Sequence, residues 1–373
     1  MARPCQNAIL TAMKYGYLRQ ALFLCVTGLL CMGMTSCWYV RQAGFFIAER
    51  SQAIPVSHML ADPATPSDIQ DFLLRVGEIR RFSHEQLGLS ETGSFTSYVS
   101  TEKDYIAMVI SACADDSFKR YEWWYPVLGS MPYRGFYVRE DADFIHARLR
   151  RQGYDVLLRK VDAFSSLGFF KDPLYSFMIN YEEGELADLL IHESAHATLF
   201  IKNENQFNEE FATFVGRVGA ELYLLDQYGA DSKEMAELHK RRRDSQIFSG
   251  FLRESARLLE EVYARKDLDR AAKLEAKGQI LAARKAEFKE QTINELRDGA
   301  FAYFDMSLVN NAYLDLYRLY EEDLSLYQEY LEVVSRGDLK TFVVNVSALT
   351  GKSKKKNSDI KKAMTEAITH SRL

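Results

Sequence analysis

Two histidines four residues apart place the strongest constraint on how this chain folds. His192 and His196 lie in the segment Ile191-His192-Glu193-Ser194-Ala195-His196. In a helix, side chains at positions i and i+4 lie one above the other on the same face. Apolar residues around the pair recur with helical spacing, at Leu186, Leu189, Leu190 and Ala197. The segment therefore predicts a helix over residues 185–201 that presents both imidazoles side by side.

This HExxH pattern has the composition of a zinc site. Two imidazoles one helical turn apart can hold one Zn²⁺ at about 2.0–2.1 Å. Glu193 follows the first histidine directly and can take a proton from a water molecule that attacks a carbonyl group. The pattern predicts His192 and His196 as metal ligands, with Glu193 as the general base of a metal-dependent peptidase.

A catalytic zinc normally has three protein ligands. The segment Phe207-Asn208-Glu209-Glu210-Phe211-Ala212 follows a polar break at residues 203–206. Asn208 is a good capping residue for a helix over residues 208–228, so Glu209 would lie in the first turn and return to the metal. Glu210 is the competing residue, but it points about 100° away around the helix. We expect Glu209 to be the third ligand and Zn²⁺ to be the cofactor.

The N-terminus has the features of an export segment. Arg3, Lys14 and Arg19 give it a positive start, and no residue from Ala21 to Val40 is charged. Small residues before Cys37 resemble a bacterial lipobox, which predicts a signal peptide over residues 1–36 and lipidation of Cys37. The alternatives are an uncleaved membrane-spanning helix, which needs about 20 apolar residues, and a buried core helix. Either membrane anchor places the rest of the chain in the cell envelope outside the cytoplasm, because the positive flank favours the inside.

The remaining chain divides by composition. Residues 123–137 are rich in aromatic residues, Pro and Gly, which favours extended structure with a turn. Residues 231–300 are highly charged, with few Gly and no Pro, which predicts long helices or a helical hairpin. The expected fold class is mainly α with a small β component. After the signal segment we expect a mostly helical region, a zinc peptidase core, a second helical region and a basic tail, over residues 37–120, 121–230, 231–349 and 350–373.

Composition excludes other kinds of protein and site. The formal net charge of −5 gives no case for nucleic-acid binding. A chain cleaved before Cys37 keeps only Cys37 and Cys113, which leaves neither a disulfide framework nor a cysteine-rich zinc site. The other histidines have no paired ligand at i+3 or i+4 and are expected to be structural or surface residues: His58, His84, His146, His239 and His370.

On these segments the chain resembles a bacterial family of predicted aminopeptidases of the HExxH class, which are typically lipoproteins. The resemblance covers about Cys37 to Leu349. It rests on Tyr133–Tyr137, Ala163–Pro173, the HESAH motif, Phe207–Val215 and Asn310–Ala312. The Asn208–Ala212 segment is also similar to the Asn-Glu-Gly-Phe-Ala segment of gluzincin aminopeptidases, whose Glu is the third zinc ligand. The resemblance thus implies a gluzincin-like core, the ligand role for Glu209 and a peptide substrate.

Substrate-binding residues are harder to select. An exopeptidase needs a carboxylate for the free amine of its substrate, and the sequence does not choose between Glu183, Glu185 and Glu210. Candidate residues for binding the substrate or its oxyanion are Tyr133, Arg134, Asn310 and Asn311. For the Tyr133–Tyr137 segment, the alternative is a buried turn with an aromatic core. Many family members have Cys where this chain has Trp124 and Ser130, so a disulfide at that place is absent.

The alternative function is a membrane-anchored binding or assembly protein with a structural or inactive zinc site. The charged region 231–300 would then offer a surface to a partner, although a solvated hairpin has the same composition. The cleft distinguishes the two functions. Metal ligands converging beside an open cleft favour the enzyme, whereas a cleft filled by side chains from residues 231–300 favours the binding protein.

Overall fold

The computed structural model describes residues 38–125, 129–161, 171–202, 204–297, 299–319, 324–350 and 357–372. The chain forms two units, Met1–Gln52 and Ala53–Leu373. In the first unit, the described part is helix α2 (Trp38–Arg50). The predicted signal segment and Cys37 lie outside the described residues. Among the helices that the structure describes, none is both long and apolar enough to cross a membrane.

A three-stranded antiparallel sheet in the second unit has the order β6-β3-β7. Its strands are β3 (Ala107–Ala114), β6 (Tyr133–Phe136) and β7 (Tyr154–Val161). Ser111 of β3 is paired with Tyr133 on one side and Leu157 on the other, and Val109 is paired with Arg159. Paired residues and residues two apart share a face of a sheet. These five side chains therefore lie on one face, while their immediate neighbours in the strands lie on the other.

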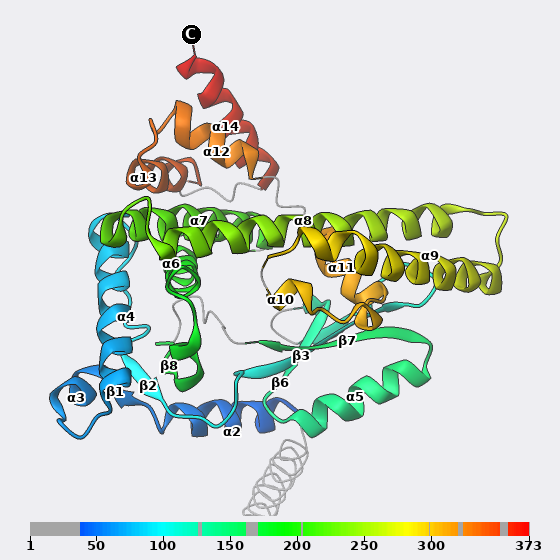
Figure 1. Cartoon of the computed structure of the whole chain (residues 1–373), viewed down its shortest axis with the longest axis horizontal. Coiled ribbons are helices and arrows are strands. Elements are labelled where there is room, and N and C mark those ends of the chain that lie inside the picture. Colours follow the sequence, from blue (N-terminus) through cyan, green and yellow to red (C-terminus); the bar gives the residue numbers. More distant parts are fainter. Residues whose placement is uncertain are drawn as a thin grey trace, which may run out of the picture. The chain divides into compact units, whose positions relative to one another are not determined.

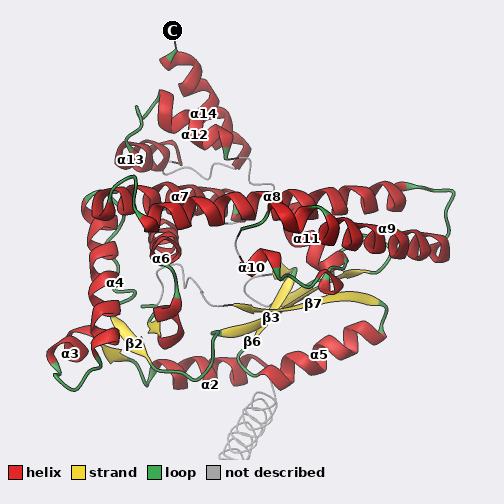
Figure 2. Cartoon of the chain, viewed as in Figure 1, coloured by secondary structure: helices red, strands yellow, loops and turns green. Residues whose placement is uncertain are grey.

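Helices cover both faces of this sheet. Helix α5 (Arg139–Arg151) lies on one side, and the short helix α10 (Gly299–Ala302) lies with α11 (Asn311–Leu319) on the other (Figure 2). Within α5, Ala142 and Leu149 are fully buried. The sheet is thus held between helices and presents only part of each face to solvent.

Two smaller β structures accompany this sheet. Strands β1 (Ile54–Pro55), β2 (Ser97–Val99) and β8 (Leu174–Tyr175) form a sheet in that order, with the short helix α3 (Val56–Ala61) after β1. Strands β4 (Trp123–Tyr125) and β5 (Gly129–Met131) pair antiparallel, and Trp124 stands directly opposite Ser130. The extended structure predicted for residues 123–137 is therefore confirmed.

The largest hydrophobic core is built around three helices, α4 (Ser67–Glu85), α6 (Glu183–Thr198) and α7 (Asn205–Tyr228). Helix α6 buries Leu186, Leu190 and Ile191 completely, which is the apolar face predicted by the helical spacing. Helix α7 buries Phe207 and Phe211 in the same core. Packing against this core fixes the rotation of α6, and so fixes the direction in which its two histidines point.

Helices α8 (Lys233–Ala264) and α9 (Arg270–Glu290) form the predicted hairpin and lie side by side (Figure 1). Each begins with a capping side chain. Ser232 accepts a hydrogen bond from the backbone of Met235, and Asp269 accepts one from the backbone of Ala272. The hairpin is joined to α10 and α11 by a second hydrophobic cluster with Phe248, Leu252, Phe288 and Leu314 among its buried members. The prediction of long helices over residues 231–300 is confirmed.

Three helices follow, α12 (Ser325–Val333), α13 (Leu339–Thr350) and α14 (Asn357–Ser371). Most of the predicted basic tail forms α14. That helix buries Ile360, Met364 and Ile368 in the core that also contains α6 and α7. The end of the chain is therefore part of the folded unit. The prediction of a mainly α chain with a small β component is confirmed.

Candidate metal centre

Helices α6 and α7 bring three potential metal ligands together. His192, His196 and Glu209 each offer one ligand atom, and the three atoms lie within 4.8 Å of one another. Nε2 of His192 is 3.8 Å from one carboxylate oxygen of Glu209, and Nε2 of His196 is 3.6 Å from the other. The two imidazole rings stand edge to face, with centroids 4.6 Å apart. Two nitrogens and a carboxylate oxygen form a donor set that suits zinc.

A buried asparagine holds the connection between these helices. Oδ1 of Asn208 accepts a hydrogen bond from the backbone N–H of Ile201, and Nδ2 donates one to the carbonyl of the same residue, both at 2.8 Å. The prediction that Asn208 caps the helix is wrong, because α7 begins one turn earlier at Asn205. Inside the helix, the Asn208 amide satisfies the backbone of the preceding loop. That contact fixes the start of α7, and with it the position of Glu209.

The two helices approach each other closely beside the ligands. A Cβ built on Gly216 of α7 would lie 2.6 Å from Oδ1 of Asp188, 3.1 Å from the carbonyl oxygen of Asp188 and 3.1 Å from Cβ of His192. Only a residue without a side chain fits at this distance. The close approach brings the backbone of α7 against the turn of α6 that carries the first histidine.

Glu209 and Glu210 point in different directions, as expected for adjacent residues of a helix, which lie about 100° apart around its axis. Glu210 is buried and accepts hydrogen bonds from the Tyr327 hydroxyl at 3.0 Å and from Nζ of Lys361 at 2.9 Å. These contacts hold the Glu210 side chain against α12 and α14 and direct it away from the histidines. Of the two adjacent carboxylates, Glu209 is the one that lies beside His192 and His196.

The electrostatics of the cluster favour the forms that bind metal. Burial, aided by His196 and Arg217, lowers the pKa of His192 to about 4 against the opposing charge of Glu209. His192 is therefore a neutral imidazole at pH 7, the form in which histidine binds metal. Burial tends to raise the pKa of Glu209, but hydrogen bonding and attraction from His196 and His192 outweigh it and lower that pKa. The carboxylate is ionised, as a ligand must be.

His196 offers a further observation on the fit of a metal. Its side chain is 5% exposed, and Nε2 faces Glu209. Among the described residues, no hydrogen-bond partner reaches its buried Nδ1. The ring is thus held by packing and by the group that Nε2 faces, which is compatible with metal ligation through Nε2.

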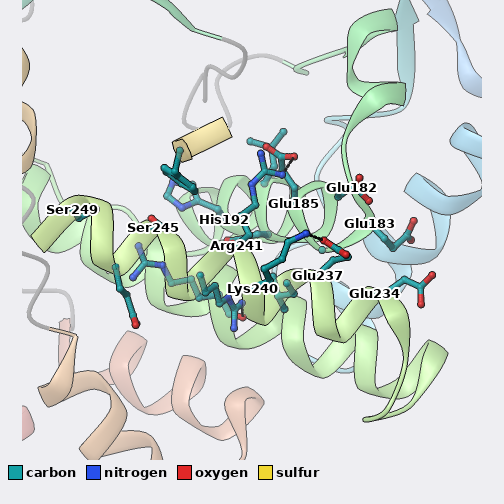
Figure 3. Close-up of a pocket in the computed structure, with 18 of the residues that line it drawn as sticks. Glu182, Glu183, Glu185, His192, Glu234, Glu237, Lys240, Arg241, Ser245 and Ser249 are labelled. Atoms are coloured by element: carbon teal, nitrogen blue, oxygen red, sulfur yellow. Dashed lines mark hydrogen bonds and ion pairs between the residues drawn. The ribbon is translucent and has the colours of Figure 1, made fainter. Parts of the chain in front are cut away.

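A large pocket opens beside the cluster. Its volume is 1490 Å³, above the 300–1,000 Å³ typical of small-molecule sites. His192 and Glu193 line it from α6, and the Arg241–Arg253 stretch of α8 lines it from the facing side (Figure 3). Helix α8 therefore forms a wall of the pocket and does not fill it. The three potential metal ligands lie beside an open cleft, which is the observation that favours an enzyme.

Two carboxylates of α6 that line this pocket, Glu183 and Glu185, form ion pairs. Glu185 accepts a hydrogen bond from Arg241 at 2.7 Å, which joins α6 to α8. Glu183 accepts hydrogen bonds from Arg75 at 3.0 Å and from the Tyr223 hydroxyl at 3.2 Å. Both carboxylates that the sequence suggested for an amine site on α6 thus have structural partners already.

Asp188, which sequence reasoning missed, lies one helical turn before His192 and lines the pocket. Burial, with a smaller contribution from the charge of Glu185, raises the pKa of Asp188 to about 6 against the lowering effect of Arg242 and Arg217. The sequence could have indicated that Asp188 lies beside His192, because residues four apart share a helix face.

The four predicted substrate-binding residues fall in different places. Tyr133 shares its sheet face with Arg159. The charge of Glu209 acts on the Tyr133 hydroxyl, whose pKa is raised first by burial and then by that charge. Arg134, the next residue in β6, points to the other face, where its guanidinium lies 5.7 Å from the Phe136 ring. The structure therefore brings Tyr133 toward the metal centre and separates it from Arg134.

Asn310 and Asn311 attach α11 to the sheet. The amide of Asn310 donates a hydrogen bond to the carbonyl of Val156 at 3.1 Å. Asn311 is fully buried and donates from its backbone to Asp155 at 2.7 Å and from its amide to the carbonyl of Ala114 at 2.9 Å. These contacts give both residues a structural role, and contact with a substrate stays a prediction for them.

Comparison with known proteins agrees with this geometry. A family model described as "Putative aminopeptidase" matches residues 38–360. Neither the curated proteins nor the solved structures gave a significant match. Because the family match spans most of the sequence, including all three potential ligands and Glu193, the chain belongs to this aminopeptidase family.

Proposed function

We propose that this chain is a zinc-dependent peptidase in which His192, His196 and Glu209 bind the metal and Glu193 is the general base. The observation that carries the proposal is the convergence of the three ligand atoms within 4.8 Å beside an open pocket. The aminopeptidase family supports peptide hydrolysis as the reaction. A gluzincin-like core, with one ligand pair on α6 and the third ligand on α7, is part of the same proposal.

Each residue of the proposed site has its own role in peptide hydrolysis. Zinc, when bound by these ligands, supplies a Lewis acid to the carbonyl group of the peptide bond. Glu193 lines the pocket next to the first histidine and takes the proton of the attacking water, then passes it to the amine that leaves. The Tyr133 hydroxyl, held in its neutral form by burial and by Glu209, can donate a hydrogen bond to the oxyanion. The Glu185–Arg241 pair keeps α8 in place along the pocket.

The anchor is a separate part of the proposal. Lipidation at Cys37 or an uncleaved helix would hold the catalytic unit at the membrane of the cell envelope. The family match begins at residue 38, directly after that cysteine. The peptidase assignment does not depend on which anchor is used.

The test separates metal binding from turnover. The purified protein should bind about one zinc per chain and hydrolyse peptides from a library in a chelator-sensitive way. Glu193→Gln should keep the zinc and lose turnover by at least about 10²-fold, because it removes the base and leaves the ligands in place. Glu254→Gln is a matched control, since Glu254 is exposed on α8 and pairs with Arg257. Full zinc occupancy in the His192→Ala, His196→Ala double variant, or equal turnover in Glu193→Gln and wild type, would refute the proposal.

A further inference from the structure

The middle of α8 carries a row of polar side chains along the wall of the pocket. Ser245, Ser249 and Arg253 follow one another at intervals of four residues, so they lie on one face of the helix, and Gln246 lies beside them. We call these four residues the polar stripe. All four line the same pocket as His192 of the candidate metal centre. The polar stripe therefore borders the cavity in which the proposed reaction takes place.

The side chains of the polar stripe are available to a ligand. In the described ranges of the chain, none of the four forms a hydrogen bond or an ion pair with another residue. Arg241, earlier on the same helix, differs because it is paired with Glu185 at 2.7 Å. Arg253 is half-buried and lines the pocket, yet no described carboxylate neutralises it. A guanidinium of this kind is suited to receive a carboxylate through two parallel hydrogen bonds.

Aromatic rings stand beside the polar stripe. Phe301 of α10 and Tyr317 of α11 line the same pocket. Both rings contact Phe248, at centroid distances of 5.4 and 6.0 Å, and Phe248 directly precedes Ser249 in α8. This end of the pocket therefore has hydrogen-bonding groups along α8 and apolar rings next to them. Such a combination can bind the backbone of a peptide through the polar groups and its side chains through the rings.

The two ends of the pocket differ in charge. Around the starts of α6 and α8, the basic residues Lys240, Arg241 and Arg242 are outnumbered by five carboxylates that also line the pocket: Glu182, Glu183, Glu185, Glu234 and Glu237. The polar stripe carries one charge, on Arg253. Figure 3 shows the labelled carboxylates on one side of His192 and the two serines of the stripe on the other. The charges therefore favour a peptide that lies with its amino end toward the carboxylates and its carboxyl end along the stripe.

We propose that the polar stripe binds the part of the peptide that leaves with the new amine, and that Arg253 receives its C-terminal carboxylate. This inference rests on the proposed peptidase function. Arg253 lies eight residues beyond Ser245, which is about 12 Å along a helix. An extended peptide covers that length with about three to four residues. The C-terminal carboxylate reaches Arg253 only in short peptides, so the site selects its substrates by the position of their C-terminus.

A series of alanine peptides from two to six residues, each as the free acid and as the C-terminal amide, tests this assignment. In initial rates of wild type, the acid should have a KM about tenfold lower than the amide at one or two of these lengths, and the same KM at the others. Arg253→Gln should raise the KM of the preferred acid about tenfold, as expected for losing a charged hydrogen bond. Its KM for the amides should stay within about twofold of wild type, and Arg253→Lys should keep part of the preference.

Two further variants separate the parts of the assignment. Arg257→Gln is the matched control, because Arg257 lies one turn further along α8, pairs with Glu254 and Glu261, and is not among the described residues that line the pocket. It should change no KM in the series. Ser249→Ala should raise the KM of acid and amide alike, by about twofold to tenfold, because its hydroxyl binds the peptide backbone and not the terminus.

Several results would overturn the assignment. Equal KM values of acid and amide at every length, or a preference for the acid that survives Arg253→Gln, would show that Arg253 does not bind the C-terminus. Equal effects of Arg253→Gln and Arg257→Gln would reduce the effect to general surface charge. Calorimetry of the same peptides on Glu193→Gln separates the two levels of inference. If wild type hydrolyses no peptide, the proposed function fails, whereas equal Kd values for acid and amide at every length, or no binding of either, refute the carboxylate site itself.

Discussion

Gly216→Ala tests whether the close approach of α6 and α7 sets the geometry of the metal centre. The new methyl group would lie 2.6 Å from the Asp188 carboxylate, which can rotate away. It would also lie 3.1 Å from the Asp188 carbonyl oxygen and 3.1 Å from Cβ of His192, which cannot move without shifting α6. Overpacking of this kind lowers the free energy of unfolding by about 1–3 kcal/mol. The higher helix propensity of Ala offsets about 1 kcal/mol of this loss. We expect a net loss of about 1 kcal/mol in the free energy of unfolding.

The effect on zinc should be larger than the effect on stability. A shift of a few tenths of an ångström between the helices separates His192 from Glu209, and we expect zinc affinity to fall about tenfold, as for other supports of metal ligands. Chemical denaturation of the metal-free protein and competitive zinc titration measure the two effects. Gly278→Ala on α9 is the control, because nothing lies within 4 Å of its added Cβ. It should gain up to about 1 kcal/mol and keep its zinc affinity. An unchanged zinc affinity in Gly216→Ala would refute the reasoning.

Three further predictions concern neighbouring carboxylates and the anchor. Glu209→Ala should lose zinc affinity with little change in stability, whereas Glu210→Ala should keep zinc and lose about 1–3 kcal/mol of stability, because Lys361 and Tyr327 lose their buried acceptor. Titration and denaturation of both variants would show the reverse pattern if Glu210 were the ligand. Because burial raises the pKa of Asp188 from 3.8 to about 6, its ionisation costs the folded state stability above pH 6 and ceases to do so below pH 3.8. Metal-free Asp188→Asn should thus be up to about 3 kcal/mol more stable than wild type at pH 7, with the difference vanishing toward pH 3.8; a pH-independent difference in denaturation would contradict this. Cys37→Ser should abolish lipid labelling and leave an unprocessed precursor, and a native protein that begins at Met1 would instead indicate a membrane helix.

The predictions that succeeded rest on short-range periodicity. His192 and His196 lie on one helix, so their proximity follows from a spacing of four. Glu209 and Glu210 are adjacent, so their divergence follows from the rotation per residue. The long helices of residues 231–300 likewise follow from composition within each segment. In each case the information lies within a few turns of chain.

The predictions that failed or missed depend on contacts between distant segments. Asn208 has the chemistry of a cap, but the helix continues past it because the loop at Ile201 uses its amide. Arg134 follows Tyr133 directly and points to the opposite face of the strand, and the sequence alone does not show which face lies toward Glu209.

The contact between Glu210 and Lys361 has a practical consequence for anyone who shortens this protein. The family match ends at residue 360, which invites truncation at that point. A chain ending there would lose Lys361 together with Met364 and Ile368, and so would expose the apolar surface that these residues cover. It would also leave the buried carboxylate of Glu210 without its cation, near the start of the helix that carries Glu209, the proposed third ligand. Weak zinc binding by such a fragment would then result from the loss of most of α14 and would not measure the zinc affinity of the full-length protein.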